Sequence, residues 1–262
     1  MRPNKKALFI ILVILAFLAT VHFLGRDSSN PKQQPTAVVA GSGVTTKPSF
    51  DKQQYPLSQA SSLWVVVNKG RQLPKTYVPA NLTVPNVSLR LSSGSPEMEV
   101  RSDTAQAMQE MFAGAAEQGI KLMLASGYRS YTEQVSLYDG YVASDGKAAA
   151  DASSAHPGFS EHQTGLAADL EPANRVCEVA QCFDATPEGK WLVANAYKYG
   201  FIIRYPKDKE DLTGYEYEPW HVRYVGKDLA AQINQTGQTL ERFFGLPNYV
   251  DYSATPFQLR SD

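Results

Sequence analysis

The order of apolar and polar positions divides the chain into regions of different character. Residues 7–24 are apolar except at two late positions, and basic side chains precede them. As a helix this run would extend about 27 Å, close to the thickness of the hydrocarbon core of a bilayer. We therefore expect residues 1–25 to be a membrane anchor. A cleaved signal peptide is the alternative, although the small residues near the end of the run are wrongly spaced for cleavage.

The stretch after the apolar run is polar. Residues 26–60 are rich in Ser, Pro, Gln, Gly and Thr over most of their length and show no apolar periodicity, which is typical of a flexible linker. We expect a folded domain over residues 61–247 and a tail, packed or frayed, over residues 248–262. Because basic residues precede the apolar run, the positive-inside rule places the domain outside the cytoplasm. The protein would be a single-pass membrane protein, or secreted if the N-terminus is cleaved.

Within the folded region, predicted helices and short strands mix without strict alternation. Apolar residues recur at helical spacing from Ser102 to Gln118, and Ser130 with Glu133 has the spacing of a capping box that starts another helix. Further helices are expected at 186–199, 227–235 and 239–244, and strands at 63–67, 120–125, 201–204 and 221–225. This order predicts an α+β fold with helices packed around a small antiparallel sheet.

Composition and charge exclude several classes of protein. The 262 residues are 43% hydrophobic and 19% charged, which is too apolar for long disorder. With 25 basic and 26 acidic residues, the net charge of −1 leaves no positive excess to neutralise phosphates. We therefore expect no nucleic-acid partner, and we expect a monomer.

The chain has two cysteines, Cys177 and Cys182. Two cysteines exclude a disulfide-dense scaffold and a zinc site of four cysteines. In an oxidising compartment, the short spacing favours a small disulfide loop. Metal binding by the pair is the alternative, but no second pair of ligands has a suitable spacing.

The candidate chemistry lies in two polar segments, residues 160–169 and 218–221. Two histidines and one carboxylate are a usual ligand set of catalytic zinc, and a further carboxylate then takes the proton of the attacking water. His162, Asp169 and His221 can supply the ligands, and Glu218 the base. Spacing alone leaves structural histidines as an alternative. On an extended strand, Glu218 and His221 would also face opposite sides, so a turn between them is required.

Three segments resemble the VanY-type D-alanyl-D-alanine carboxypeptidase family, among the LAS zinc peptidases that trim peptidoglycan stem peptides. They are residues 126–130 followed by Gln134, residues 156–169, and residues 218–221, in the order typical of the family. The resemblance covers about residues 63–246. It implies a zinc-peptidase fold of the hedgehog/DD-peptidase type, Zn²⁺ as cofactor, and peptidoglycan stem peptides as substrates.

The resemblance also implies a role for individual residues. It makes His162, Asp169 and His221 the zinc ligands and Glu218 the catalytic base. It makes Arg129 the residue that holds the substrate and polarises its carbonyl. The positions expected to bind substrate are Ser126, Tyr128, Gln134 and Ser160.

Other residues near these motifs have two interpretations each. Tyr215 and Tyr217 would line the substrate groove or pack as ordinary aromatic residues. We interpret Glu161 as an exposed or outer carboxylate rather than the base, and His156 as a residue that shapes the following turn or lines the cleft. Trp220 would pack in the core and hold its neighbours in place.

A serine peptidase is the rival enzyme class. It would need Ser-x-x-Lys together with Ser-Asp-Asn and Lys-Thr-Gly. Ser-x-x-Lys occurs in the folded region at Ser144 and Lys147, but both partner motifs are absent. The favoured function is a zinc-dependent D,D-carboxypeptidase that removes the terminal D-alanine from stem pentapeptides. An L,D-carboxypeptidase acting on tetrapeptides and a non-catalytic cell-wall binding module are the alternatives.

Overall fold

The computed structural model describes residues 51–261. The predicted anchor or signal peptide over residues 1–25, and most of the predicted linker, lie outside these residues. Among the described residues, no helix combines the length and the apolar character needed to cross a membrane.

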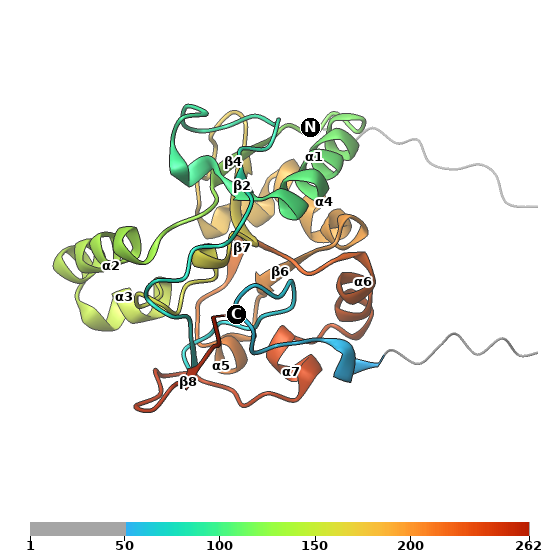
Figure 1. The fold of residues 1–262 in the computed structure, drawn as a ribbon. Coiled ribbons are helices and arrows are strands. Elements are labelled where there is room, and N and C mark those ends of the chain that lie inside the picture. The colour runs from blue at the N-terminus through green and yellow to red at the C-terminus, as the bar shows by residue number, and fades with distance from the viewer. Residues whose placement is uncertain (1–50, 262) are drawn as a thin grey trace, which may run out of the picture. The chain divides into compact units, whose positions relative to one another are not determined.

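A four-stranded antiparallel sheet positions the functional residues (Figure 1). Its strand order is β4-β5-β7-β6. The strands are β4 (Leu122–Ser126), β5 (Ala167–Pro172), β6 (Phe201–Tyr205) and β7 (Glu218–Tyr224). The α+β class with a small antiparallel sheet is thereby confirmed. Strand β5 is not among the strands expected from the sequence; its residues alternate between apolar and polar from Ala168 to Glu171, and all six of them are buried.

Two pairs of short strands complete the β-structure. The pair β2 (Leu82–Thr83) and β3 (Val100–Arg101) is antiparallel. The pair β1 (Arg71–Gln72) and β8 (Phe257–Gln258) is parallel and joins the C-terminal segment to an early part of the domain. The packed part of the described chain therefore extends beyond residues 61–247 at both ends. Ala60, which precedes this range, and Leu259, which follows it, are both buried.

The two helices with the clearest sequence signals form as expected. Helix α1 (Ser102–Ala116) precedes Gly119, whose φ is +75°. Helix α2 (Tyr131–Asp145) begins with the predicted capping box, in which the Ser130 hydroxyl accepts the Glu133 N–H and the Glu133 carboxylate accepts the Ser130 N–H. The remaining α-helices are α3 (Lys147–Ser153), α4 (Pro187–Asn195), α5 (Glu210–Thr213), α6 (Lys227–Thr236) and α7 (Leu240–Phe244).

Short 3₁₀ helices connect several of these elements. They are η1 (Lys52–Gln54), η2 (Pro96–Met98), η3 (Glu161–Thr164), η4 (Gln181–Ala185) and η5 (Ala196–Tyr199). The helix expected over residues 186–199 is thus divided into α4 and η5, and Gly200 ends it in the left-handed conformation. Segment η3 carries His162 directly before β5.

The two faces of the sheet have different partners because side chains alternate along each strand. One face is apolar and is covered by α1 and α4. Its contacts join Leu124, Leu170 and Val222 of the sheet to Met108, Met111, Trp191 and Leu192 of the helices. The other face carries buried polar residues, among them Asp169, His221 and Arg223. The candidate functional residues are therefore on the face away from α1 and α4.

The strand predicted at residues 63–67 does not form. Val65, Val66 and Val67 are fully buried, as a strand in the core would be, but the segment is irregular. Its carbonyl groups are satisfied by buried guanidinium groups instead of a neighbouring strand. Arg223 donates to Leu63 and Val65, Arg71 to Val66, and Arg204 to Val67. Because buried carbonyls need only a donor, side chains can replace the sheet ladder here.

Candidate active site

A cavity of about 250 Å³ opens on the polar face of the sheet. The predicted ligands, the predicted base and the predicted substrate-holding arginine all line it. These residues are His162, Asp169, His221, Glu218 and Arg129. The fold therefore brings together side chains that are separated by up to 92 positions in the sequence, from Arg129 to His221.

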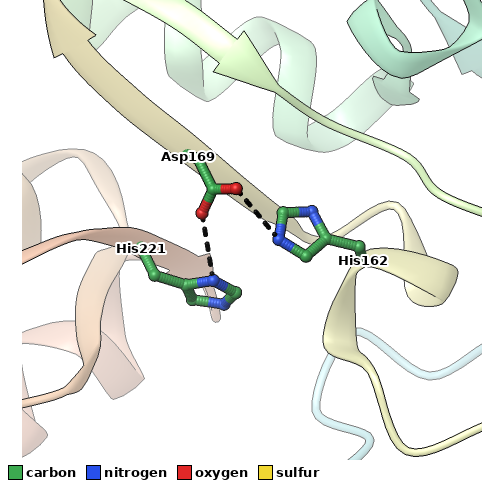
Figure 2. Close-up of side chains that lie close together, drawn as sticks. All are labelled: His162, Asp169 and His221. Atoms are coloured by element: carbon green, nitrogen blue, oxygen red, sulfur yellow. Dashed lines mark ion pairs between the residues drawn. The ribbon is translucent and has the colours of Figure 1, made fainter. Parts of the chain in front are cut away.

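Three of these side chains form a compact group (Figure 2). The Nε2 atom of His162 lies 3.3 Å from Asp169 Oδ2, and the Nδ1 atom of His221 lies 3.2 Å from Asp169 Oδ1. One ligand atom from each residue lies within 4.8 Å of the other two, and all three residues are buried. Asp169 on β5 and His221 on β7 are direct partners in the sheet register, and His162 comes from η3.

The group fits a zinc ion. Two imidazole nitrogens and one carboxylate oxygen are a donor set that zinc prefers, and a set of three leaves a fourth tetrahedral position open. The Nδ1–H of His162 donates to the Gly127 carbonyl at 2.6 Å, which leaves Nε2 as the ligand atom. Asp169 Oδ1 is buried and has no hydrogen-bond partner among the described residues. A cation would satisfy this oxygen.

The charges of His162 and Asp169 also suit a cation. Burial, and secondarily the Arg129 charge, lower the pKa of His162 despite the opposing effect of Asp169, so its imidazole is neutral and has a free lone pair. Burial opposes ionisation of Asp169, but His162 and His221 outweigh it and hold the pKa of Asp169 well below its usual range. The site thus presents an ionised carboxylate beside its imidazoles.

Glu218 reaches the cavity through a β-bulge. Between β6 and β7 the register shifts, so that Ile203 pairs with Val222 but Tyr205 pairs with Glu218. Between these two pairs, β7 has three residues, 219–221, and β6 has only Arg204, so β7 contains two extra residues. Because a bulge re-aims side chains, Glu218 Oε2 comes to lie 3.6 Å from His221 Nδ1. The turn expected between Glu218 and His221 is therefore a bulge within β7. It contains Pro219, which has no N–H to donate to a neighbouring strand.

Burial raises the pKa of Glu218 to about 8, with Asp169 adding to the effect and His221 and Arg129 opposing it. Burial lowers the pKa of its neighbour His221, but the nearby carboxylates of Asp169 and Glu161 outweigh burial and raise this pKa to about 9. A carboxyl group whose pKa lies near neutral pH can take up a proton and return it during a reaction.

Arg129 is held at the edge of the group by polar contacts. Its Nη2 donates to Ser126 Oγ at 3.3 Å and lies 4.0 Å from Asp169 Oδ2, while its Nη1 donates to Gln134 Oε1 at 3.0 Å. Ser126 in turn donates to Asp169 Oδ2 at 2.6 Å. Gln134 also donates to the Ala155 carbonyl at 2.7 Å. Ser126 and Gln134 therefore orient Asp169 and Arg129, although Gln134 also lines the cavity.

The structure separates the other residues expected to bind substrate. Ser160 lines the cavity and caps η3, accepting the His162 N–H. Tyr215 and Trp220 also line the cavity, whereas Tyr128 is buried and is not among the lining residues. Tyr217 is not among the lining residues, and a hydrogen bond with Asp184 adds to the burial that raises its pKa to about 12.

His156 lies outside the ligand group. Its ring stacks on Tyr252 at 3.6 Å between centroids, and its Nε2 lies 2.7 Å from Asp151. Its backbone carbonyl accepts the Phe159 N–H across the turn at residues 157–158, and its side chain is not among those that line the cavity. Cys177 and Cys182 are joined in a disulfide with a Cα–Cα distance of 5.6 Å.

Of the two interpretations of Glu161, the structure supports an outer carboxylate behind the ligand group. Glu161 is not an exposed carboxylate: it is fully buried and paired with Arg204 and Arg223. Burial alone would raise its pKa, but the two arginines outweigh this effect and hold the pKa of Glu161 below its usual range. The signal in the sequence is the presence of a single arginine inside each of two otherwise buried strand segments, at Arg204 and Arg223.

Comparison with known proteins identifies the family. A family model described as D-alanyl-D-alanine carboxypeptidase (VanY) matches residues 97–227, which include every residue of the ligand group. The chain belongs to the VanY family. As a member of this family, it is a peptidase of the zinc carboxypeptidase type.

Individual VanY-like proteins are similar over most of the domain. The putative carboxypeptidase YodJ of Bacillus subtilis (strain 168) is 44% identical over 188 residues, covering 72% of this chain and 69% of YodJ. The structure of the LD-carboxypeptidase LdcB superposes with a TM-score of 0.68 at 44% identity, over 71% of this chain and 87% of LdcB. A variant of the D,D-pentapeptidase VanY from a VanB-type cassette, in complex with Zn(II), gives 0.58 at 34% identity, over 71% of this chain and 99% of that one.

Proposed function

We propose that this protein is a zinc-dependent D,D-carboxypeptidase that removes the terminal D-alanine from peptidoglycan stem pentapeptides. The observation that carries the proposal is the position of Glu218, a buried carboxylate 3.6 Å from His221, at the edge of the ligand group formed with His162 and Asp169. A module that only binds cell wall needs no proton acceptor at this place. The family description and the Zn(II) complex of a D,D-pentapeptidase support the proposed bond and metal.

His162 Nε2, an Asp169 oxygen and His221 Nδ1 would hold the zinc ion. When bound, zinc lowers the pKa of water and polarises the carbonyl of the scissile bond. Glu218 accepts the proton that water loses on attack and returns it to the leaving amine of D-alanine. Arg129 presents its guanidinium to the same cavity, where it stabilises the negative charge of the carbonyl oxygen or holds the terminal carboxylate of the substrate.

An L,D-carboxypeptidase is the second candidate, and one observation favours it. LdcB, named as an LD-carboxypeptidase, has the higher identity and the higher TM-score of the two solved structures compared. The machinery described above serves either bond, because it acts on a carbonyl, a water molecule and a leaving amine. The configuration of the residue before the scissile bond distinguishes the two reactions.

Mass spectrometry of digested stem peptides tests both candidates. Purified protein is incubated with a pentapeptide and, separately, a tetrapeptide, with and without a zinc chelator. Release of D-alanine from the pentapeptide, abolished by the chelator and restored by zinc, is the expected result. Cleavage of the tetrapeptide alone would establish the L,D reaction. Release that is unaffected by the chelator would overturn the zinc mechanism.

We also propose that the domain works outside the cytoplasm as a monomer, attached to the membrane through residues 1–25. The apolar run in the sequence and the disulfide support this location, because disulfides persist in oxidising compartments. Protease treatment of intact cells is expected to degrade the domain while leaving cytoplasmic markers intact. Recovery of the full-length chain from the membrane fraction would show that the N-terminus is retained, and size-exclusion chromatography would test the monomer.

A further inference from the structure

The carboxylate of Glu161 is held from one side by two buried arginines. Its Oε1 accepts a hydrogen bond from Arg204 Nε at 2.8 Å and another from Arg223 Nη1 at 2.8 Å. All three side chains have no exposed surface. The second oxygen, Oε2, is buried and has no hydrogen-bond partner among the described residues. Oε1 of this ionised carboxylate thus accepts two hydrogen bonds, and Oε2 is available to accept another.

The available oxygen faces the back of His221. The Nδ1 side of the His221 ring is directed at Asp169 and Glu218, in the ligand group. Its Nε2 is buried, likewise without a hydrogen-bond partner in residues 51–261, and lies 3.8 Å from Glu161 Oε2. A buried imidazole N–H and a buried carboxylate oxygen that both lack partners are each costly to leave unpaired. A shift of about 1 Å would bring them to hydrogen-bond distance.

We propose that Glu161 is a positioning residue that accepts the Nε2–H of His221 and thereby keeps Nδ1 free to bind the metal. The two ring nitrogens of histidine are coupled, because a proton retained on one of them leaves the lone pair on the other. A carboxylate behind a ligating histidine fixes its tautomer and ring orientation and makes it a better donor to the metal.

The arginines give Glu161 a fixed orientation. Arg204 is bound on its far side to Glu241 of α7, and Arg223 donates to the carbonyls of Leu63 and Val65. Neither guanidinium can move without breaking these contacts. Glu161 is also the first residue of η3 and precedes His162 directly. A single 3₁₀ turn therefore supplies one ligand and the carboxylate behind another.

The inference rests on the proposed role of His221 as a zinc ligand. The ligand role of His221 and the positioning role of Glu161 can be disproved separately. Loss of zinc in His221→Ala tests the ligand assignment alone, whereas the experiments on Glu161 test what orients that ligand.

The first experiment compares Glu161→Gln with Glu241→Gln. In Glu161→Gln, both arginines still require an acceptor, so the amide oxygen stays with them and the NH₂ group turns toward His221, where it cannot accept a proton. Glu241→Gln is the matched control: it removes a buried carboxylate from the same Arg204 but does not contact His221. The dissociation constant of zinc is measured for each protein by competition with a chelator.

The expected result is a zinc affinity about 10–100-fold weaker in Glu161→Gln. Glu241→Gln is expected to stay close to wild type, because the amide oxygen still accepts a hydrogen bond from Arg204 and keeps it in place. Equal weakening in both variants would show that Glu161 acts only through the stability of the buried network, and would overturn the proposal. An unchanged affinity in Glu161→Gln would overturn it as well.

The second experiment needs no variant and stands even if Glu161→Gln does not fold. The chain has four histidines, so the zinc-loaded protein labelled with ¹⁵N-histidine gives few imidazole signals. The proposal requires the His221 proton to be on Nε2, in slow exchange and shifted downfield by a carboxylate acceptor. A His221 proton on Nδ1, or an Nε2 proton that exchanges rapidly with solvent, would contradict it.

Discussion

Glu218 Oε2 and His221 Nδ1 lie 3.6 Å apart on the same strand and beside the same cavity. In a regular strand, residues three positions apart face opposite sides of the sheet. The bulge in β7 removes this conflict and places a buried carboxylate next to a candidate metal ligand. Substitution of Glu218 and substitution of His221 are therefore expected to have different effects.

Glu218→Gln is expected to lower turnover by about 10²–10⁴-fold while zinc stays bound. Glutamine has nearly the same shape but cannot accept the proton. Asp169→Asn is expected to weaken zinc binding as well, because it alters a ligand. Zinc content and hydrolysis rate are measured for both. Glu216→Gln, which changes an exposed carboxylate two residues away, is the control. Near-normal turnover in Glu218→Gln would assign the base to another residue.

His162→Ala and His221→Ala are each expected to lose zinc from a starting content of about one ion per chain. Loss of the metal also lowers the melting temperature, since zinc binds the folded state. Metal analysis and thermal unfolding check both effects. His156→Ala should keep its zinc, because His156 is not in the ligand group. Full zinc occupancy in both ligand variants would refute the assignment.

Release of D-alanine is expected to be insensitive to β-lactams. Ser144, in the Ser-x-x-Lys pattern of the folded region, is exposed near the end of α2, and its hydroxyl donates to the Tyr141 carbonyl. It has no activating base in these contacts. The check is hydrolysis with and without a β-lactam, together with labelling by a fluorescent penicillin. Covalent labelling at Ser144 would argue for a serine mechanism.

Cys177 and Cys182 are expected to resist alkylation in natively exported protein until a reductant is added. Replacing both by serine should lower the free energy of unfolding by about 2 kcal/mol, the loss of loop-closure constraint for so short a loop. Denaturant unfolding of the variant and of oxidised wild type measures this difference. A reductant should lower the stability of wild type and leave the serine variant unchanged; equal effects on both would rule out this disulfide as the cause.

Asp151 is expected to contribute to stability in a pH-dependent way. Burial alone would raise its pKa, but hydrogen bonds from Lys147, Tyr138 and His156 outweigh this effect and lower the pKa from 3.8 to about 2. A carboxyl group with a lowered pKa in the folded state stabilises the protein above its unfolded-state pKa, and the contribution is lost as the pH falls through about 2. The free energy of unfolding should therefore fall more steeply between pH 4 and 2 in wild type than in Asp151→Asn. Parallel pH profiles would contradict this.

Local signals in the sequence determined much of the domain. The periodic apolar residues of α1 and the capping box of Ser130 and Glu133 specify helices without help from distant residues, because their contacts lie within a few positions. The motifs around His162 and Glu218 also determined which side chains were candidates for metal binding and proton transfer, since these residue types in this order are typical of the family.

Only the tertiary structure decided how those side chains meet. The bulge that aims Glu218 exists because β7 pairs with β6, and the pairing of Asp169 with His221 depends on the register of β5 against β7. Likewise, residues 63–67 have the composition of a strand but are irregular, because Arg204 and Arg223 reach their carbonyls from distant strands. Hydrogen bonds between residues far apart in the chain produce no periodic pattern in the sequence. The sequence therefore determined the chemistry of the site, and the packing of the sheet decided its geometry.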